Sequence, residues 1–350
     1  MKSENKKMSQ KFEARKKEHI VWALNSKTQS QTDDHFDWVR LIHQPLPEIN
    51  LSDVGLKTQI LKKTFSSPHF IGSMTAGHAQ SKKINLRLAE AAAEKNWLMC
   101  VGSQRRELTD EQAQTEWKSI RKLSPKTQFV SNIGLEELIQ TPLKNILKLA
   151  ENLEALGLII HVNPLQEALQ KKNQANFSGG LKAIEKISKN SEIPIIVKEV
   201  GFGMDLETVK RLFSLGVSVV DVSGKGGTHW GLLEGLRHQK NKNNLFESSQ
   251  AFKDWGYSTI ESLLMCNSLA KKNVVWASGG IRSGVHSAKC LALGAKAVGI
   301  AQPMMKAAVS SKLAVLNVMD QFDYELKVAL FCTGVVNLKQ LDTKKVLDFL

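Results

Sequence analysis

The feature that most constrains the fold of this chain is a regular alternation of short apolar runs with longer segments of helical pattern, from about residue 70 to residue 300. The apolar runs are Phe70–Met74, Leu98–Val101, Gln128–Asn132, Leu158–Val162, Ile195–Lys198, Val217–Val222, Val274–Ala277 and Ala297–Ile300. Between them, segments such as Ile84–Ala93 carry apolar residues at helical spacing. Because a helix follows each strand, the strands should be parallel, and about eight such units close a barrel. The sequence therefore predicts an α/β fold, a parallel (β/α)8 TIM barrel.

Two parts of the chain lie outside this alternation. Residues 1–65 precede the first strand, and we expect them to form an N-terminal extension that caps a barrel made of residues 66–350. The segment Gly224–Lys272, after the sixth strand, is too long for a single crossover helix and has several glycines near its start. This segment predicts a lid-like insertion.

The composition makes the surface basic, with a formal net charge of +14 at pH 7. Nucleic acid is therefore a partner to consider, but Lys and Arg are scattered, and no zinc finger, basic zipper or aromatic RNA-binding motif occurs. No apolar run approaches the length of a membrane span, and the first residues are polar and rich in Lys. We expect a cytoplasmic protein with no nucleic-acid partner and no membrane association.

Four polar side chains follow the fourth apolar run within one short turn: His161, Asn163, Gln166 and Glu167. The carboxyl end of a strand is where an α/β barrel holds its reactive groups. An imidazole, two amides and a carboxylate can together bind an anion, relay a proton and hold a hard cation. Each residue alone is equally typical of a polar loop with an Asn-Pro turn. Their combination favours an enzyme over a scaffold.

The loops after the seventh and eighth strands predict a phosphate site. Ala277–Gly284 and Gly299–Gln302 provide free backbone amides and helix starts, and these two loops are the recurrent phosphate site of parallel barrels. We therefore expect a phosphorylated cofactor. Lys198, at the end of the fifth strand, needs a negative partner, either an anionic reduced flavin or Glu199 at the rim. Ser223 and Thr228 are further hydrogen-bond donors, or simply turn residues.

These motifs, taken in order, resemble those of the type 2 isopentenyl-diphosphate delta-isomerases, FMN-dependent barrel enzymes of isoprenoid synthesis. The similarity extends from Arg15 to about Leu341. The matching segments are Arg15-Lys16 with His19, Ser73–Thr75, Gly102–Arg105, Asn132, His161–Glu167, Val197–Gly201, Ser223–Trp230, Glu234, Gly279–Arg282 and Leu293–Ala295. The chain departs from the family pattern at Ala76, His229 and His286, where Gly, Ser and Asp are usual, and in the loop with Lys171 and Lys172. None of these positions is assigned to chemistry.

The resemblance implies a role for each site residue. FMN contacts fall on Ser73, Met74, Thr75, Ser103, Asn132, Lys198, Ser223, Thr228, Gly279, Gly280, Ile281, Arg282, Ala301 and Gln302. Substrate contacts fall on Arg15, Lys16, His19, Ser103, Arg105, His161, Asn163 and Gln166. Glu167 matches the carboxylate that binds Mg²⁺, and the implied catalytic residues are Gln166, Glu234 and Lys198.

The implied reaction converts isopentenyl diphosphate to dimethylallyl diphosphate with FMN and Mg²⁺. The reduced flavin would act as acid and base with no net redox change, and NADPH would serve only to reduce it. The resemblance also implies a homotetramer or a larger homo-oligomer.

Two alternatives remain open at this point. An FMN-dependent oxidoreductase of the 2-hydroxy-acid oxidase type has the same fold, but its usual His-Gly-x-Arg-Gln segment does not occur here. A flavin-binding protein without catalysis, acting on RNA or a partner through its basic surface, is the other. The presence of Arg105, Gln166 and Glu167 argues against that reading.

Overall fold

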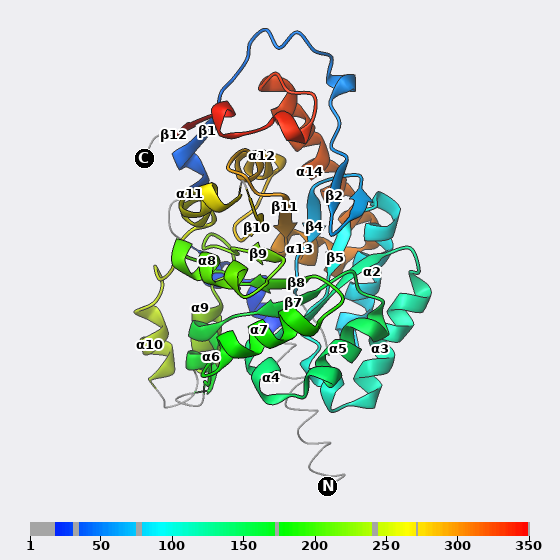
Figure 1. Cartoon of the computed structure of the whole chain (residues 1–350), viewed down its shortest axis with the longest axis vertical. Helices are drawn as coiled ribbons and strands as arrows, with labels where there is room; N and C mark the ends of the chain where they lie inside the picture. Colours follow the sequence, from blue (N-terminus) through cyan, green and yellow to red (C-terminus); the bar gives the residue numbers. More distant parts are fainter. Residues whose placement is uncertain are drawn as a thin grey trace.

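The computed structural model describes residues 18–30, 35–74, 79–171, 175–239, 244–270 and 272–348. Its centre is a closed barrel of parallel strands (Figure 1). The strands are β4 (His69–Ile71), β5 (Leu98–Cys100), β6 (Gln128–Gly134), β7 (Leu158–His161), β8 (Ile195–Lys198), β9 (Val219–Asp221), β10 (Val274–Ser278) and β11 (Ala297–Ile300). Each strand pairs with the next along the chain, and β11 pairs with β4 to close the ring. The predicted (β/α)8 barrel is confirmed.

Helices follow the strands around the outside of this barrel. The crossover helices are α2 (Ala79–Lys95), α3 (Glu111–Leu123), α5 (Leu143–Leu153), α7 (Gly180–Asn190), α8 (Leu206–Ser214), α11 (Thr259–Ala270), α12 (Gly284–Ala292) and α14 (Lys312–Cys332). Additional helices directly follow strand ends or lie in the long loop: α4 (Leu135–Gln140), α6 (Pro164–Lys171), α9 (Trp230–Arg237), α10 (Leu245–Gln250) and α13 (Gln302–Ser310).

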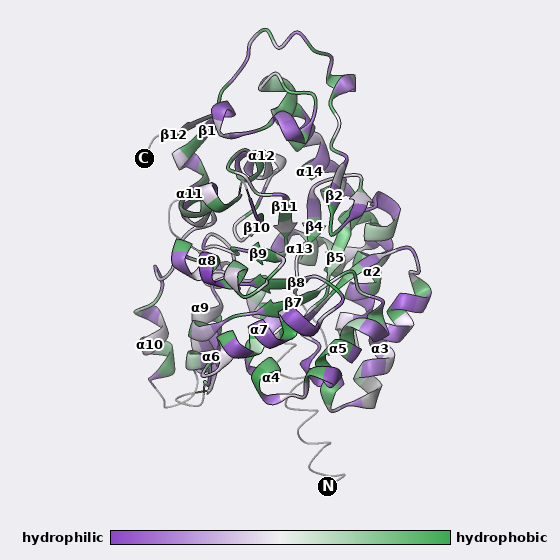
Figure 2. Ribbon diagram, in the orientation of Figure 1, coloured by the Kyte–Doolittle hydropathy of each residue, from purple (hydrophilic) through white to green (hydrophobic). Residues whose placement is uncertain are grey.

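The barrel strands are apolar because both of their faces are buried. Strands β7 and β8 carry the runs Leu158–Ile160 and Ile195–Val197, which are buried throughout. Figure 2 shows these strands as hydrophobic, while α3 presents alternating hydrophilic and hydrophobic faces. This contrast is the expected pattern for a parallel sheet covered by amphipathic helices.

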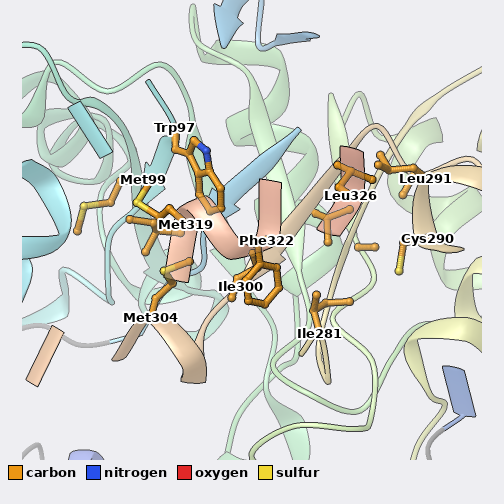
Figure 3. Packing of buried hydrophobic residues seen from close by; sticks show 14 of the residues in the cluster. Trp97, Met99, Ile281, Cys290, Leu291, Ile300, Met304, Met319, Phe322 and Leu326 are labelled. Atoms are coloured by element: carbon orange, nitrogen blue, oxygen red, sulfur yellow. The ribbon is translucent and has the colours of Figure 1, made fainter. Parts of the chain in front are cut away.

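The largest apolar cluster lies between the barrel and the helices α2, α12, α13 and α14. In Figure 3, Met319 and Phe322 of α14 lie beside Trp97 and Ile300, close to the barrel wall. Burial of each such large apolar side chain stabilises the folded state by about 1.5–3 kcal/mol relative to leaving the side chain exposed. The long helix α14, which follows the last barrel strand, is therefore held mainly by its apolar face.

A hairpin closes the amino-terminal end of the barrel. Strands β2 (Thr58–Ile60) and β3 (Lys63–Phe65) pair antiparallel across a tight turn, and Leu61 and Lys62 in this turn have positive φ. Ile60 and Phe65 belong to the same buried cluster as the barrel residue Trp276. With this end filled, a ligand must enter from the carboxyl ends of the strands.

A polar network joins the buried Ser67 and His69, at the start of β4, to the partly buried Asp323 of α14. His69 Nδ1 lies 2.9 Å from Asp323 Oδ1, and Ser67 Oγ donates to the same oxygen over 2.5 Å. The indole nitrogen of Trp97 donates to the other oxygen, Asp323 Oδ2, over 3.1 Å. This network lies at the opposite end of the barrel strands from the predicted site, so its role is structural.

The insertion after β9, predicted to be lid-like, contains α9, α10 and α11. Within Gly224–Lys272, α11 is the crossover helix, and α9 packs against α6 with Leu233 and Glu234 fully buried. Helix α9 therefore forms part of the wall of the barrel mouth.

Residues 28–30 of the predicted extension lie against the same loop. Gln29 and Thr228 form an antiparallel bridge, Ser30 N donates to Gly227 O over 2.8 Å, and His229 N donates to Thr28 O over 2.7 Å. Another part of the extension, β1 (Val39–Leu41), pairs antiparallel with β12 (Val346–Asp348), near the carboxyl end of the chain (Figure 1). Within the described ranges, no helix combines the length and the apolar character that a membrane span requires.

Candidate active site

A cavity of about 1540 Å³, counted out to its open mouth, lies at the carboxyl ends of the barrel strands. Its lining contains most of the residues predicted from the sequence: His19, Ser73, Met74, Ser103, Arg105, Asn132, His161, Asn163, Gln166, Glu167, Lys198, Ser223, Thr228, Gly279, Gly280, Ile281, Arg282, Ala301 and Gln302. Glu234 lies directly behind this lining, bonded to Gln166. Arg15, Lys16 and Thr75 lie outside the described residues. The fold thus gathers the described members of the predicted set in one place.

The turn between β7 and α6 orients an amide and a carboxylate together. Asn163 Nδ2 donates to Gln166 Oε1 over 3.0 Å and to Glu167 Oε1 over 3.1 Å. Because the oxygen of Gln166 accepts from Asn163, its Nε2 points the other way and donates to Glu234 Oε1 over 3.1 Å. The orientation of the Gln166 amide is therefore set from both sides.

Glu234, in α9, is the most heavily bonded carboxylate of the site. Its Oε1 accepts from Gln170 over 2.9 Å and lies 3.0 Å from His19 Nε2, and Arg237 binds Oε2. Burial would raise the pKa of Glu234, but the hydrogen bond and charge of His19, the charge of Arg237 and the Gln166 hydrogen bond lower it well below its usual range. Glu234 is therefore ionised throughout the physiological range.

His161 is oriented by the neighbouring strand. Asn132 Nδ2 donates to Val101 O over 3.0 Å, which leaves its Oδ1 to accept from His161 Nδ1 over 2.9 Å. His161 Nδ1 therefore carries a hydrogen. Behind Asn132, Gln104 Oε1 accepts from its backbone N–H over 3.2 Å.

Lys198 is buried at the end of β8, and its Nζ donates to the backbone oxygen of Glu199 over 2.6 Å. The carboxylate of Glu199 is not its partner, since Oε2 accepts the N–H groups of Val200, Gly201 and Phe202 over 2.5, 2.7 and 2.6 Å. Burial raises the pKa of Glu199 to about 7, although these hydrogen bonds lower it. Lys198 and Glu199 therefore form no direct ion pair, although the charge of Lys198 also lowers the pKa of Glu199.

Two glycine loops meet on the other side of the cavity. Gly279 and Gly280 have φ of 97° and 73°, and a Cβ on Gly279 would lie 2.0 Å from Gly224 O. A Cβ on Gly280 would also clash, because it would lie 2.9 Å from Gly226 Cα. Only glycine permits this backbone geometry and this close approach. Nearby in the cavity, the buried Ser73 Oγ has no hydrogen-bond partner within the described residues. These are the features of a site for a phosphorylated group with additional hydrogen-bonding atoms.

Sequence reasoning missed several residues that the structure places at the cavity or in its hydrogen-bond network: Gly72, Glu137, Gln170, Asp221 and Met305. Gln170 lies one helical turn after Gln166, so the helix face could have indicated it. Asp221 ends β9, where its carboxylate accepts from Ser278 Oγ over 2.9 Å, and burial raises its pKa. Glu137 is found only through its spatial partner, because its ion pair with Arg105 joins two different loops.

Comparison with known proteins first defines the class. Residues 150–348 match the model of the FMN-dependent dehydrogenase family. A solved structure of an oxidised active mutant of (S)-mandelate dehydrogenase has a TM-score of 0.68 at 18% sequence identity and covers 93% of this chain and 92% of its own. A mutant of flavocytochrome b2 with benzoylformate has a TM-score of 0.67 at 17% identity, covering 94% and 82%. At such identities these two structures support the fold alone.

Relatives with much higher identity define the family within this class. An isopentenyl-diphosphate delta-isomerase of Bdellovibrio bacteriovorus is 44% identical over 341 residues, which cover 96% of this chain and 98% of the relative. A second, from Legionella pneumophila strain Corby, is 44% identical and covers 95% and 97%. A third, from Oceanobacillus iheyensis, is 35% identical and covers 95% of each chain. The chain therefore belongs to the isopentenyl-diphosphate delta-isomerase family.

Proposed function

We propose that this protein isomerises isopentenyl diphosphate to dimethylallyl diphosphate, with FMN and Mg²⁺ as cofactors and no net redox change. One observation carries the proposal: the series of hydrogen bonds from Asn163 through Gln166 to the ionised Glu234. This series lies at one side of a cavity whose other side is made of glycine loops. The family to which the chain belongs supports the same reaction.

The cavity fits FMN on chemical grounds. Gly279 and Gly280 line the cavity and would present backbone to a phosphate, and the buried Ser73 Oγ offers a donor that the described residues do not use. Lys198 Nζ would stabilise negative charge on the flavin ring, and Arg282 would bind near the phosphate. FMN in its reduced form would supply acid-base chemistry and an electron-rich face toward a developing positive charge. NADPH would be required only as the reductant.

The Mg²⁺ site would be shared with the substrate. Glu167 is buried, lines the cavity and accepts from Asn163, so one of its carboxylate oxygens is held at a defined position. The described residues contain no cluster of three or more His, Cys, Asp and Glu side chains placed to hold a metal. Mg²⁺ commonly uses one or two carboxylates together with phosphate oxygens. We therefore assign Glu167 as the protein carboxylate of a Mg²⁺–diphosphate complex.

The isomerisation adds a proton to the terminal carbon of the double bond and removes one from the carbon on its other side. Arg105, His161 and His19 would bind and orient the diphosphate end, which brings the alkene to a fixed place in the cavity. Gln166, held between Asn163 and Glu234, would orient the reacting carbons or relay a proton. Trp230, whose ring lies edge-on to His19 with centroids 5.5 Å apart, would exclude water.

The test is anaerobic incubation of the full chain with FMN, Mg²⁺ and isopentenyl diphosphate, with and without NADPH. We expect dimethylallyl diphosphate to form only when the flavin is reduced, and far more product than NADPH consumed. A flavin-loaded protein that forms no product under these conditions would refute the proposal. A cytoplasmic location and a homo-oligomeric state remain predictions of this function, and size-exclusion chromatography with light scattering would test the second.

A further inference from the structure

A carboxylate lies among the groups assigned to the diphosphate. Glu137 Oε1 accepts from Arg105 Nη1 over 2.8 Å, and both side chains line the cavity. Arg105 follows β5 and Glu137 lies in α4, which follows the adjacent strand β6, so the barrel places them side by side. The side chain of Glu137 is only 15% exposed, so this ion pair is a built feature of the cavity wall.

Gly134 makes room for this carboxylate. Its φ of −79° and ψ of 153° are values that any residue adopts, so the backbone conformation does not require glycine there. A Cβ on Gly134 would lie 2.2 Å from Glu137 Oε2 and 3.2 Å from His161 Nε2, so a side chain here would displace the carboxylate from its present position. One oxygen of Glu137, Oε1, thus binds the guanidinium of Arg105, and the other, Oε2, lies over Gly134 on the side of the His161 imidazole. Both of these groups are assigned to the diphosphate.

A negative charge at this position opposes an anionic ligand. Free diphosphate carries more negative charge than its Mg²⁺ complex, and the repulsion between two charges grows with their product. Glu137 also competes with phosphate oxygens for the Arg105 guanidinium, since carboxylate and phosphate bind it in the same way. Both effects weaken the binding of the metal-free ligand more than that of the complex.

We propose that Glu137 is a specificity-determining residue that makes this site select the Mg²⁺ complex of a diphosphate over the free diphosphate. The selection works by repulsion of the unwanted form, a common source of specificity. The proposal rests on the proposed function in one respect, the assignment of Arg105 and His161 to the diphosphate. Glu137 acts through electrostatics and takes no part in the proton transfers.

The test measures the binding of inorganic pyrophosphate to the full chain by titration calorimetry, with flavin content determined by absorbance. Each protein is titrated in excess Mg²⁺ and in EDTA. In EDTA, we expect Glu137→Gln to bind pyrophosphate about fivefold more tightly than the unmodified protein, the size expected for a partly exposed charge. In Mg²⁺, we expect the two affinities to agree within about twofold, because most of the ligand charge is neutralised.

Two further variants separate the effect of the Glu137 charge from the effect of its contact with Arg105 and from the effect of the protein's net charge. Glu137→Ala also removes the contact with Arg105, and it should show the same gain in EDTA if charge is the cause. Glu185→Gln is the matched control, because Glu185 also forms an ion pair, with Lys189 on α7, but does not line the cavity. It should leave both affinities unchanged.

The proposal is overturned if Glu137→Gln and Glu137→Ala bind pyrophosphate no more tightly, or less tightly, than the unmodified protein in EDTA. Glu137 would then be a positioning residue for Arg105. An equal gain in pyrophosphate affinity in EDTA and in Mg²⁺ would also overturn the proposal, since Glu137 would then weaken the binding of the free ligand and of its Mg²⁺ complex equally. These outcomes do not depend on turnover. A failure of the isomerase assay therefore leaves the selectivity measurable, and a failure here leaves the proposed reaction standing.

Discussion

Gln166 donates a hydrogen bond to Glu234 across 3.1 Å, although the two residues lie 68 positions apart in the chain. The bond joins α6, on the rim of the barrel, to α9 of the long insertion, and these two helices pack against each other. The Glu234 carboxylate also contacts His19 of the N-terminal segment and Arg237 of its own helix. Three separate parts of the chain thus meet at one buried charge.

The first prediction concerns this charge. Glu234→Gln should lower turnover about 100-fold, because the neutral amide no longer pairs with His19 and Arg237 or holds Gln166 in one orientation. Flavin content should not change, since Glu234 lies behind the substrate end of the cavity. Steady-state assays with absorbance of bound flavin measure both, and Glu247→Gln on the exposed face of α10 is the control. A turnover rate within twofold of that of the unmodified protein would show that Glu234 has no role in the mechanism.

The second prediction concerns the metal. Glu167→Gln should raise the Mg²⁺ concentration for half-maximal turnover about tenfold or more, because an amide is a weaker ligand for a hard cation than a carboxylate. Flavin binding should persist. A Mg²⁺ titration of turnover tests this, with Glu151→Gln on the exposed face of α5 as a control. An unchanged Mg²⁺ requirement would contradict the assignment of Glu167.

The third prediction concerns pH. His229 Nε2 donates to Phe252 O over 2.8 Å, and its Nδ1 accepts from Leu232 N over 3.0 Å, so the ring is neutral. Burial lowers the pKa of His229 below its ordinary value of 6.5, because the charged ring is disfavoured. The folded state then binds fewer protons than the unfolded state. The contribution of His229 to the free energy of unfolding is therefore fully present above pH 6.5 and is lost as the pH falls below 6.5.

His229→Ala removes both hydrogen bonds and the titrating group. The variant should be less stable than the unmodified protein by about 1–2 kcal/mol at pH 7.5, and this difference should narrow at pH 5.5. Urea unfolding of both proteins at the two pH values measures it. A difference that stays constant or widens on acidification would show that the ring is not held neutral.

The fourth prediction concerns the closed end of the barrel. Asp323→Ala should lower the free energy of unfolding by about 2–3 kcal/mol, because His69, Ser67 and the Trp97 indole would lose their common acceptor. Asp320→Ala, on the same helix, is a matched control. Its side chain is 58% exposed and pairs with Lys95, so the loss should stay below about 1 kcal/mol. Equal losses in urea unfolding would mean that the buried network adds nothing beyond a surface pair.

The barrel was predictable because each strand is buried on both faces and therefore appears in the sequence as an apolar run. Ile195–Lys198 and Ala297–Ile300 were predicted to the residue. The first run was predicted to Met74, but β4 ends at Ile71, and Ser73 and Met74 line the cavity. An apolar run therefore identified a strand well and its end poorly, because Met74 beyond the strand end is also apolar and partly buried.

The site was predictable only in part. The resemblance to the isomerase family indicated Gln166, Glu167 and Glu234, and the fold brings them together. Glu137 was not predicted as a site residue, because its role depends on its contact with Arg105 and on the absence of a side chain at Gly134. No local pattern around residue 137 carries that information.

By itself, the sequence determined the barrel, the end of the barrel that holds the polar groups, and the family. Local periodicity and ordered motifs are properties of neighbouring residues, so they can be read along the chain. The tertiary structure alone decided that Glu199 caps three backbone N–H groups and does not pair with Lys198, that α9 forms a wall of the site, and that Glu137 lies beside the anion-binding groups. Hydrogen bonds and charges act over a few ångströms in space, and only the closed barrel determines which distant residues come within that range.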